Sequence, residues 1–382
     1  MLGTLGISTG GIRMGHAAAA MRESAPVFVV GYMRSGTTLL HSILAAHPAV
    51  FSSAYETKYF EYFALFHHLY PDPRDEEARA RLIQTIADIV LNGNIRPVRR
   101  AAPGYCPAEP PLPPAAIAAL VAATQPDPAY GAIYRQVFDH LAARAGKRRW
   151  IEKTPQHTYF IDTIKEAMPD ALFVEIVRDP RDVLASKKRY KAVVGTSQKF
   201  SQEERAYLAV QRVYDPFWDA LAWRMATRAV RQAEERWRDS LFTVRYEGLV
   251  AAPEETLRAA CDFLALPFGA AMLDVKWVST GEGVREDARG FQTDPLGRWR
   301  SALRPAEVSI AQTLTAPYLR AFGYERAPVG WRGRIGLVPL LARSGGEFFI
   351  RLYRRWRMGG VPFMMATLAN YRRELGKLLR RR

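Results

Sequence analysis

The sequence has few of the features that mark disulfide-bonded, metal-binding or membrane-spanning proteins. It contains only two cysteines in 382 residues, Cys106 and Cys261, which form neither a disulfide framework nor a metal motif. A reducing compartment is therefore expected. No apolar run reaches the roughly 20 residues that a transmembrane helix needs. The seven histidines are scattered, and none joins a carboxylate in a zinc motif, so we predict no metal site.

The N-terminal segment lacks the signals of a secreted protein. Residues 1–25 are rich in Gly and Ala and contain neither an early basic cluster nor a long apolar stretch, unlike a signal peptide. Met14 and Met21 are alternative start positions. We predict a flexible segment here and a cytoplasmic protein.

Positive charge is concentrated at the C-terminus. The formal net charge is +16, and residues 331–382 carry thirteen Lys and Arg against two Glu, a net +11. The first 330 residues therefore carry only +5. A basic balance favours polyanionic ligands or anionic surfaces. The sequence contains no recognised nucleic-acid-binding motif, so we expect no nucleic acid partner.

The basic C-terminal tail allows three interpretations. Residues 348–357 mix aromatic side chains with arginines, and Leu375, Leu378 and Leu379 recur at helical spacing. Such a segment can bind an anionic membrane surface. It can also bind a polyanionic substrate, or form a pair of helices packed on the catalytic body. Our hypothesis is peripheral membrane contact; the sequence does not indicate an oligomeric state.

Short β-branched and aromatic runs alternate with helical patterns along the chain. We predict strands at 26–31, 149–152, 171–177 and 241–246, and helices at 39–46, 76–91, 114–123, 130–145, 159–168, 203–239 and 254–264. This alternation predicts an α/β fold with a central parallel sheet flanked by helices on both faces. We expect a single domain at 26–330, a surface insertion or lid at 96–114, and a basic amphipathic helical tail at 331–382.

The first strand leads into a glycine-containing loop that opens a helix. Backbone N–H groups and the helix N-terminus make such a turn an anion site. The nucleotide-binding P-loop has a Lys directly after its last Gly. Here Thr37 follows Gly36, and the cation, Arg34, comes two residues before it. A P-loop kinase is therefore disfavoured, although a kinase-like phosphotransferase stays as one alternative function.

A second phosphate-binding pattern follows the strand at 171–177. Arg178 ends this strand, and Ser186 lies eight residues later on the next predicted helix. A guanidinium and a hydroxyl in this arrangement can converge on one phosphate. The alternative is a turn held by local ion pairs. A non-catalytic basic module that binds membranes or polyanions is the other alternative function, but it leaves both phosphate patterns unexplained.

Together the two patterns resemble those of sulfotransferases that use 3′-phosphoadenosine 5′-phosphosulfate (PAPS). Residues 31–40, Gly-Tyr-Met-Arg-Ser-Gly-Thr-Thr-Leu-Leu, are similar to the family's 5′-phosphosulfate loop, P-[RK]-S-G-T-T-L, and the match extends through His47-Pro48. The resemblance covers about three quarters of the chain. It implies a P-loop-like sulfotransferase fold, closer to the protein-tyrosine and bacterial types than to the cytosolic type. It also implies metal-free transfer of a sulfuryl group to a hydroxyl. Tyrosine, glycan, lipid and small-metabolite acceptors stay open.

The resemblance also assigns residues to the donor. Arg178 and Ser186 would hold its 3′-phosphate. Tyr246 and Arg298, the latter with Arg300 as its alternative, would lie near the nucleotide. The 5′-phosphosulfate loop would comprise Arg34, Ser35, Gly36, Thr37, Thr38 and Leu39.

Sulfuryl transfer needs cations for the leaving oxygen and a base for the acceptor proton. Arg34 and Lys153 are the expected cations. Glu56, in Tyr-Glu-Thr-Lys-Tyr, resembles the base Glu of protein-tyrosine sulfotransferases. Cytosolic enzymes use a His in Lys-Thr-His, where this sequence has Pro155. His157 is therefore the alternative base, and Glu61 a third.

Overall fold

The computed structural model describes residues 22–53, 55–61, 72–93, 111–196, 214–274, 276–279, 283–289 and 296–379. Most of the predicted N-terminal segment and of the predicted lid at 96–114 lie outside these residues. The first part of the predicted helix at 203–239 also lies outside them.

The described residues contain one five-stranded sheet in which all neighbouring strands are parallel. Its order is β2-β3-β1-β4-β5, formed by Val50–Ser52, Arg149–Lys153, Val27–Val30, Leu172–Val177 and Leu241–Arg245. The predicted parallel sheet is thus confirmed, with four of its strands at the expected positions. Sequence analysis missed β2, because three residues are too few for a periodic pattern.

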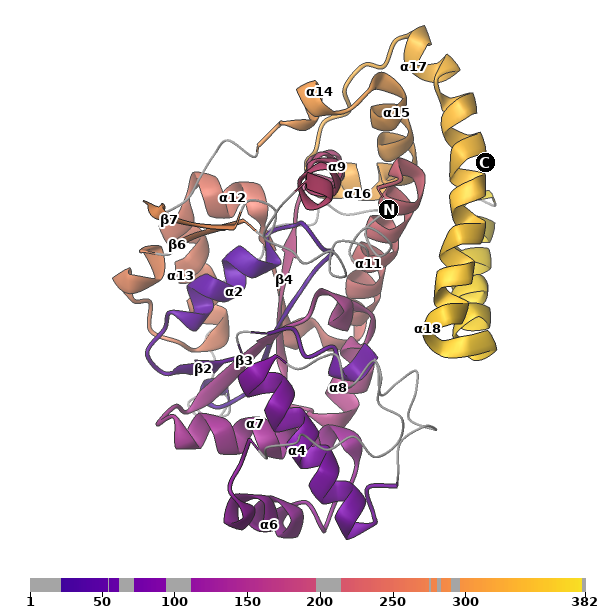
Figure 1. Ribbon diagram of the computed structural model, residues 1–382. Coiled ribbons are helices and arrows are strands. Elements are labelled where there is room, and N and C mark those ends of the chain that lie inside the picture. The colour runs from indigo at the N-terminus through magenta and orange to yellow at the C-terminus, as the bar shows by residue number, and fades with distance from the viewer. Residues whose placement is uncertain are drawn as a thin grey trace.

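Helices cover both faces of the sheet, as predicted (Figure 1). Along β1, Phe28 and Val30 point to one face and Val27 and Val29 to the other, since side chains alternate along a strand. The first face is covered by α4 (Glu76–Asn92), α6 (Pro114–Ala123), α7 (Tyr130–Arg144) and α8 (Ile161–Ala167). The second is covered by α2 (Thr37–Ala45), α12 (Tyr246–Ala251) and α13 (Pro253–Leu264).

Local sequence explains where these helices begin. Asp75 caps α4 by accepting a hydrogen bond from the Ala78 amide at 2.8 Å, and Pro253 opens α13, where its missing N–H costs nothing. The helix predicted at 159–168 begins two residues late. A 3₁₀ turn, η2 (Pro155–Tyr159), precedes it and ends at Phe160.

The remaining elements surround the carboxyl edge of the sheet and one flank. They are α9 (Pro180–Thr196), α11 (Pro216–Trp237), η3 (Arg238–Ser240), η4 (Ala270–Leu273), the antiparallel pair β6 (Lys276–Ser279) and β7 (Gly283–Arg289), α14 (Trp299–Ala302), α15 (Pro305–Leu314) and α16 (Ala316–Ala321).

The C-terminal tail is helical. It comprises α17 (Trp331–Ile335) and the 43-residue α18 (Leu337–Leu379), which lies beside α11 along one flank of the molecule (Figure 1). Leu337, Leu340 and Phe348 of α18 pack into a cluster shared with α9, α11 and α15. None of the described helices is both long enough and apolar enough to cross a membrane.

Candidate active site

The loop between β1 and α2, residues 31–36, has a backbone that requires glycine at two positions. Gly31 and Gly36 have φ angles of 135° and 104°. A Cβ on Gly31 would lie 2.4 Å from the Ile176 carbonyl oxygen, and one on Gly36 would lie 2.5 Å from the Tyr246 ring. Both the backbone conformation and the surrounding atoms therefore exclude larger residues.

The N-terminus of α2 retains hydrogen-bond donors for an anion. The first N–H groups of a helix have no partner within it, and here Gly36 supplies no side-chain cap and the first turn has no acidic residue. The Ser35 hydroxyl is fully buried and has no hydrogen-bond partner among the described residues. The predicted loop residues Ser35, Gly36, Thr37, Thr38 and Leu39 all lie at this point.

Arg34 connects the 31–36 loop to α9. Its Nε donates a hydrogen bond to Ser186 Oγ at 3.0 Å, and its guanidinium lies over the Tyr190 ring, 4.9 Å from the centroid. Arg178, at the end of β4, donates from Nη1 to the Arg34 carbonyl oxygen at 3.4 Å. The two phosphate-binding patterns predicted from sequence are therefore in direct contact.

Tyr246 and Arg298 lie on the Arg178 side of the site. The Arg178 guanidinium stacks over the Tyr246 ring at 4.3 Å. Burial raises the pKa of the Tyr246 hydroxyl, and the charges of Arg178 and Arg298 oppose that rise, which places Arg298 near the ring. Arg298 itself is exposed.

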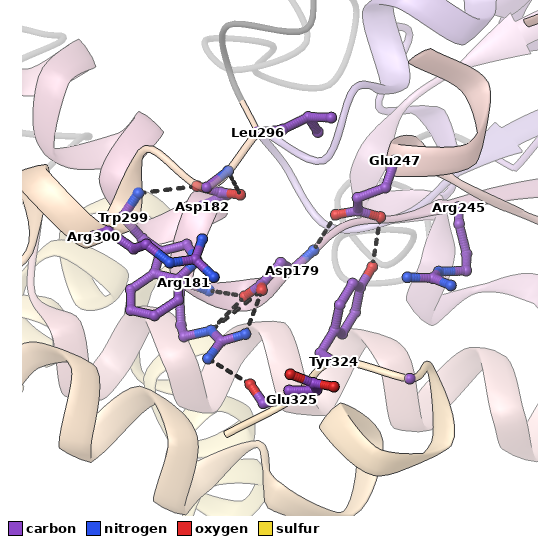
Figure 2. Close-up of a pocket in the computed structure, with 12 residues that line it drawn as sticks. Asp179, Arg181, Asp182, Arg245, Glu247, Leu296, Trp299, Arg300, Tyr324 and Glu325 are labelled. Atoms are coloured by element: carbon purple, nitrogen blue, oxygen red, sulfur yellow. Dashed lines mark hydrogen bonds and ion pairs between the residues drawn. The ribbon is translucent and has the colours of Figure 1, made fainter. Parts of the chain in front are cut away.

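Asp182 explains how Arg298 is held. Its carboxylate accepts hydrogen bonds from the Gly297 amide at 2.8 Å and the Trp299 amide at 3.0 Å (Figure 2). Burial raises the pKa of Asp182, and the charge of Arg178 and these two amides oppose the rise. Sequence analysis missed this role, although Asp182 belongs to the same Arg-Asp-Pro-Arg-Asp turn as Arg178.

A polar cavity of about 230 Å³ adjoins this side of the site. Glu247 crosses its wall, accepting hydrogen bonds from the Asp179 amide and the Tyr324 hydroxyl (Figure 2). Neither Arg34, Lys153 nor Glu56 is among its described lining residues. The cavity therefore lies beside the Arg178 turn and away from the predicted reacting groups.

The predicted cation Lys153 and the predicted base Glu56 form an ion pair. Lys153 Nζ donates to Glu56 Oε1 at 2.7 Å, and the two side chains are 11% and 33% exposed. Lys153 ends β3, the strand beside β1, so it emerges at the same sheet edge as the 31–36 loop. Carboxyl ends of parallel strands are the usual place for ligand sites in such sheets.

A buried carboxylate, Glu152, places the Glu56 segment on the sheet. Its Oε1 accepts hydrogen bonds from the Thr57 amide at 3.2 Å, the Thr57 hydroxyl at 3.0 Å and the Thr154 hydroxyl at 2.5 Å. Burial alone would raise the pKa of Glu152, but His157 and these donors outweigh burial and lower it. Sequence analysis missed Glu152; the available signal was a carboxylate within a buried strand.

Two histidines lie close to this segment without reaching solvent. His157 is fully buried, with Nδ1 2.9 Å from Glu152 Oε2 and its ring against Phe28 and Phe60. His41, which sequence analysis did not select, lies with Nε2 2.8 Å from the Ser52 hydroxyl. Burial and then the charge of Lys153 lower the pKa of His41 to about 4, so its ring is neutral near neutral pH.

Comparison with known proteins identifies the same family as the motifs. A model described as the sulfotransferase family matches residues 26–270. The nodulation protein NoeE of Sinorhizobium fredii is 26% identical over 342 residues, which cover 86% of this chain and 72% of that protein. Carbohydrate sulfotransferase 3 of Mus musculus is 23% identical over 198 residues, 50% of this chain and 40% of that enzyme.

A solved structure also resembles this chain. The sulfotransferase domain of the Synechococcus PCC 7002 olefin synthase is 22% identical, with 80% of this chain and 97% of that chain covered and a TM-score of 0.43. In the part of the chain that the structure describes, no three His, Cys, Asp or Glu side chains are grouped to hold a metal ion.

The Gly36 contact gives a prediction about the loop. Gly36→Ala should destabilise the protein by about 1–3 kcal/mol, because the new Cβ meets the Tyr246 ring and the φ angle becomes strained. Urea unfolding measures the loss. In Gly36→Ala/Tyr246→Ala the steric part should disappear while the strain remains, so the two losses should be non-additive. Strictly additive losses would contradict the contact.

Proposed function

Because the chain belongs to the sulfotransferase family, we propose that its two adjoining anion sites hold the two ends of PAPS. The enzyme transfers a sulfuryl group from PAPS to a hydroxyl-bearing acceptor. The contact between Arg34 and Ser186 carries the proposal, because it brings the 31–36 loop and the Arg178 turn within reach of a single nucleotide.

In this assignment the 31–36 loop and the start of α2 bind the 5′-phosphosulfate. The buried Ser35 hydroxyl and the uncapped helix N-terminus fit an anion at this position. Arg178 and Ser186 bind the 3′-phosphate, and Arg298 adds a further charge beside Tyr246. The cavity beside the Arg178 turn remains outside the assignment.

The chemistry follows from the groups at the sheet edge. Bound PAPS supplies an activated sulfuryl group. Arg34 and Lys153 stabilise the negative charge that develops on the leaving oxygen. Glu56 accepts the proton of the acceptor hydroxyl. Its ion pair with Lys153 holds the carboxylate in one orientation before the acceptor arrives.

Glu56 suits the role of base better than His157. The Glu56 side chain is one-third exposed and can reach an incoming hydroxyl, whereas the His157 ring is fully enclosed and hydrogen-bonded to Glu152. We therefore assign His157 to holding the Glu152 carboxylate, which in turn holds the Glu56 segment.

The variant Glu56→Gln tests the base. It keeps the shape of the side chain but cannot accept the proton, so kcat should fall by about 100-fold to 10,000-fold. The affinity for 3′-phosphoadenosine 5′-phosphate (PAP), measured by calorimetry, should stay within about threefold, because Glu56 contacts no proposed donor-binding residue. The exposed Glu76 of α4 provides a matched control, Glu76→Gln, with unchanged turnover. Turnover near that of the wild type in Glu56→Gln would remove Glu56 from the role.

We propose a carbohydrate hydroxyl as the acceptor. Support comes from the mouse relative, whose name gives carbohydrate as its substrate. Labelled transfer from PAPS should be at least about tenfold faster, in kcat/KM, to oligosaccharides than to tyrosine peptides and simple phenols. A higher rate on the peptides or phenols would reject the carbohydrate assignment without affecting the donor site.

We also propose that the tail binds an anionic membrane surface on the cytoplasmic side. Among the described residues, ten of the fourteen large exposed hydrophobic side chains lie from Trp331 onward. Five of them lie on one face of α18, at spacings of three, four and eight residues: Val338, Leu341, Phe349, Tyr353 and Trp356. The net +11 of residues 331–382 complements anionic lipid headgroups. Aromatic side chains bordered by cations are typical of helices that lie in a membrane interface.

Vesicle cosedimentation tests this surface. The full chain should bind vesicles of phosphatidylcholine with about 30% phosphatidylserine, and the binding should weaken as salt rises. The double variant Phe349→Ser/Trp356→Ser should bind about tenfold more weakly or worse, because two apolar groups are lost. Leu91→Ser removes a comparably exposed side chain from α4 and should bind as the wild type does. No binding to these vesicles at low salt would reject the proposal.

A further inference from the structure

α9 holds the 31–36 loop with two consecutive side chains. Ser186 accepts the hydrogen bond of Arg34, and the next residue, Lys187, donates from Nζ to the Tyr32 hydroxyl at 3.0 Å. The Lys187 ammonium also lies over the Tyr32 ring, 5.2 Å from its centroid. The position of the loop therefore depends on Lys187 as well as on Ser186.

Lys187 is fixed by an ion pair with Asp219 of α11. The distance from Nζ to Oδ1 is 2.7 Å, and the two side chains are 15% and 1% exposed. Burial lowers the pKa of Lys187, and Asp219 opposes this. A buried ion pair is costly to disrupt, because removing one partner leaves an uncompensated charge. The pair thus ties the loop to the N-terminal part of α11.

The same part of α11 is held by the first turns of α18. Asp219 Oδ2 accepts a hydrogen bond from the Asp215 amide at 3.1 Å, and the Asp215 carboxylate caps α11. Both Asp215 carboxylate oxygens lie 2.9 Å from the donating Ser344 hydroxyl of α18. The Trp218 indole N–H donates to the Ser344 carbonyl oxygen at 2.7 Å, and its ring stacks on Phe348.

A second contact from α18 reaches the ion pair itself. Arg351 Nη2 lies 3.7 Å from Asp219 Oδ1, the oxygen that pairs with Lys187. Ser344 and Arg351 are seven residues apart, about two helical turns, so they lie on the same face of α18. One face of the tail helix therefore contacts both carboxylates that hold Lys187.

We infer that α18 is a positioning element of the donor site. It orders Asp215 and Asp219, these orient Lys187, and Lys187 holds Tyr32 of the 31–36 loop. The inference rests on the proposed assignment of that loop to PAPS. It adds a role for the tail in donor binding that is separate from any membrane contact.

Ser344→Ala and Arg351→Met test this in the full chain, with PAP as the probe. Each should raise the calorimetric Kd for PAP by about 5-fold to 20-fold, because each removes one polar contact of the network. The KM for PAPS should rise in parallel, while the KM for the acceptor should not change. Ser344→Thr, which keeps the hydroxyl, should restore the affinity for PAP.

Thr124→Val is the matched control. It removes a buried hydroxyl that bonds within α6, which lies at the opposite end of the molecule from α9 (Figure 1). It should lower Tm about as much as Ser344→Ala but leave the Kd for PAP unchanged. If both α18 variants bind PAP within about twofold of the wild type, the inference is wrong. If the wild type itself binds no PAP, the donor-site assignment fails instead.

Discussion

The contact between Arg34 and Ser186 depends on the pairing of β1 with β4. In their parallel register Val30 lies opposite Glu175, so the loops that leave the two strands emerge at one edge of the sheet. The first loop carries Arg34, and the chain after β4 carries Arg178 and then Ser186 on α9. Strand order thus converts two patterns 150 residues apart into one anion site, as expected at the carboxyl edge of a parallel sheet.

Three cations gather at that edge, and their partners determine what they can do. Arg34 stacks on Tyr190 and Arg178 on Tyr246, whereas Lys153 pairs with Glu56. An aromatic face stabilises a guanidinium without neutralising it, so the charge stays available to a phosphate. Carboxylates are used instead one step away, where Asp182 holds the turn that carries Arg298.

Sequence alone predicted the parts of the site that depend on local spacing. The 31–36 loop, Arg178 with Ser186, and four of the five strands follow from patterns within a few residues of one another. Glu152 and Lys187 were not found, since their roles depend on partners from distant elements. Ser344 shows the limit most clearly: a small polar residue in a helix has no local signal, yet its hydroxyl contacts a buried carboxylate.

The two faces of α18 have different partners, and this relates the two proposals about the tail. The inner face contacts Asp215 and Asp219 through Ser344 and Arg351, while the outer face carries the exposed aromatic side chains. A membrane that binds the outer face would reduce the freedom of the same helix that orders the 31–36 loop. Binding free energies at two linked sites are reciprocal. If both proposals hold, PAPS must therefore increase membrane affinity by the factor by which the membrane increases affinity for PAPS.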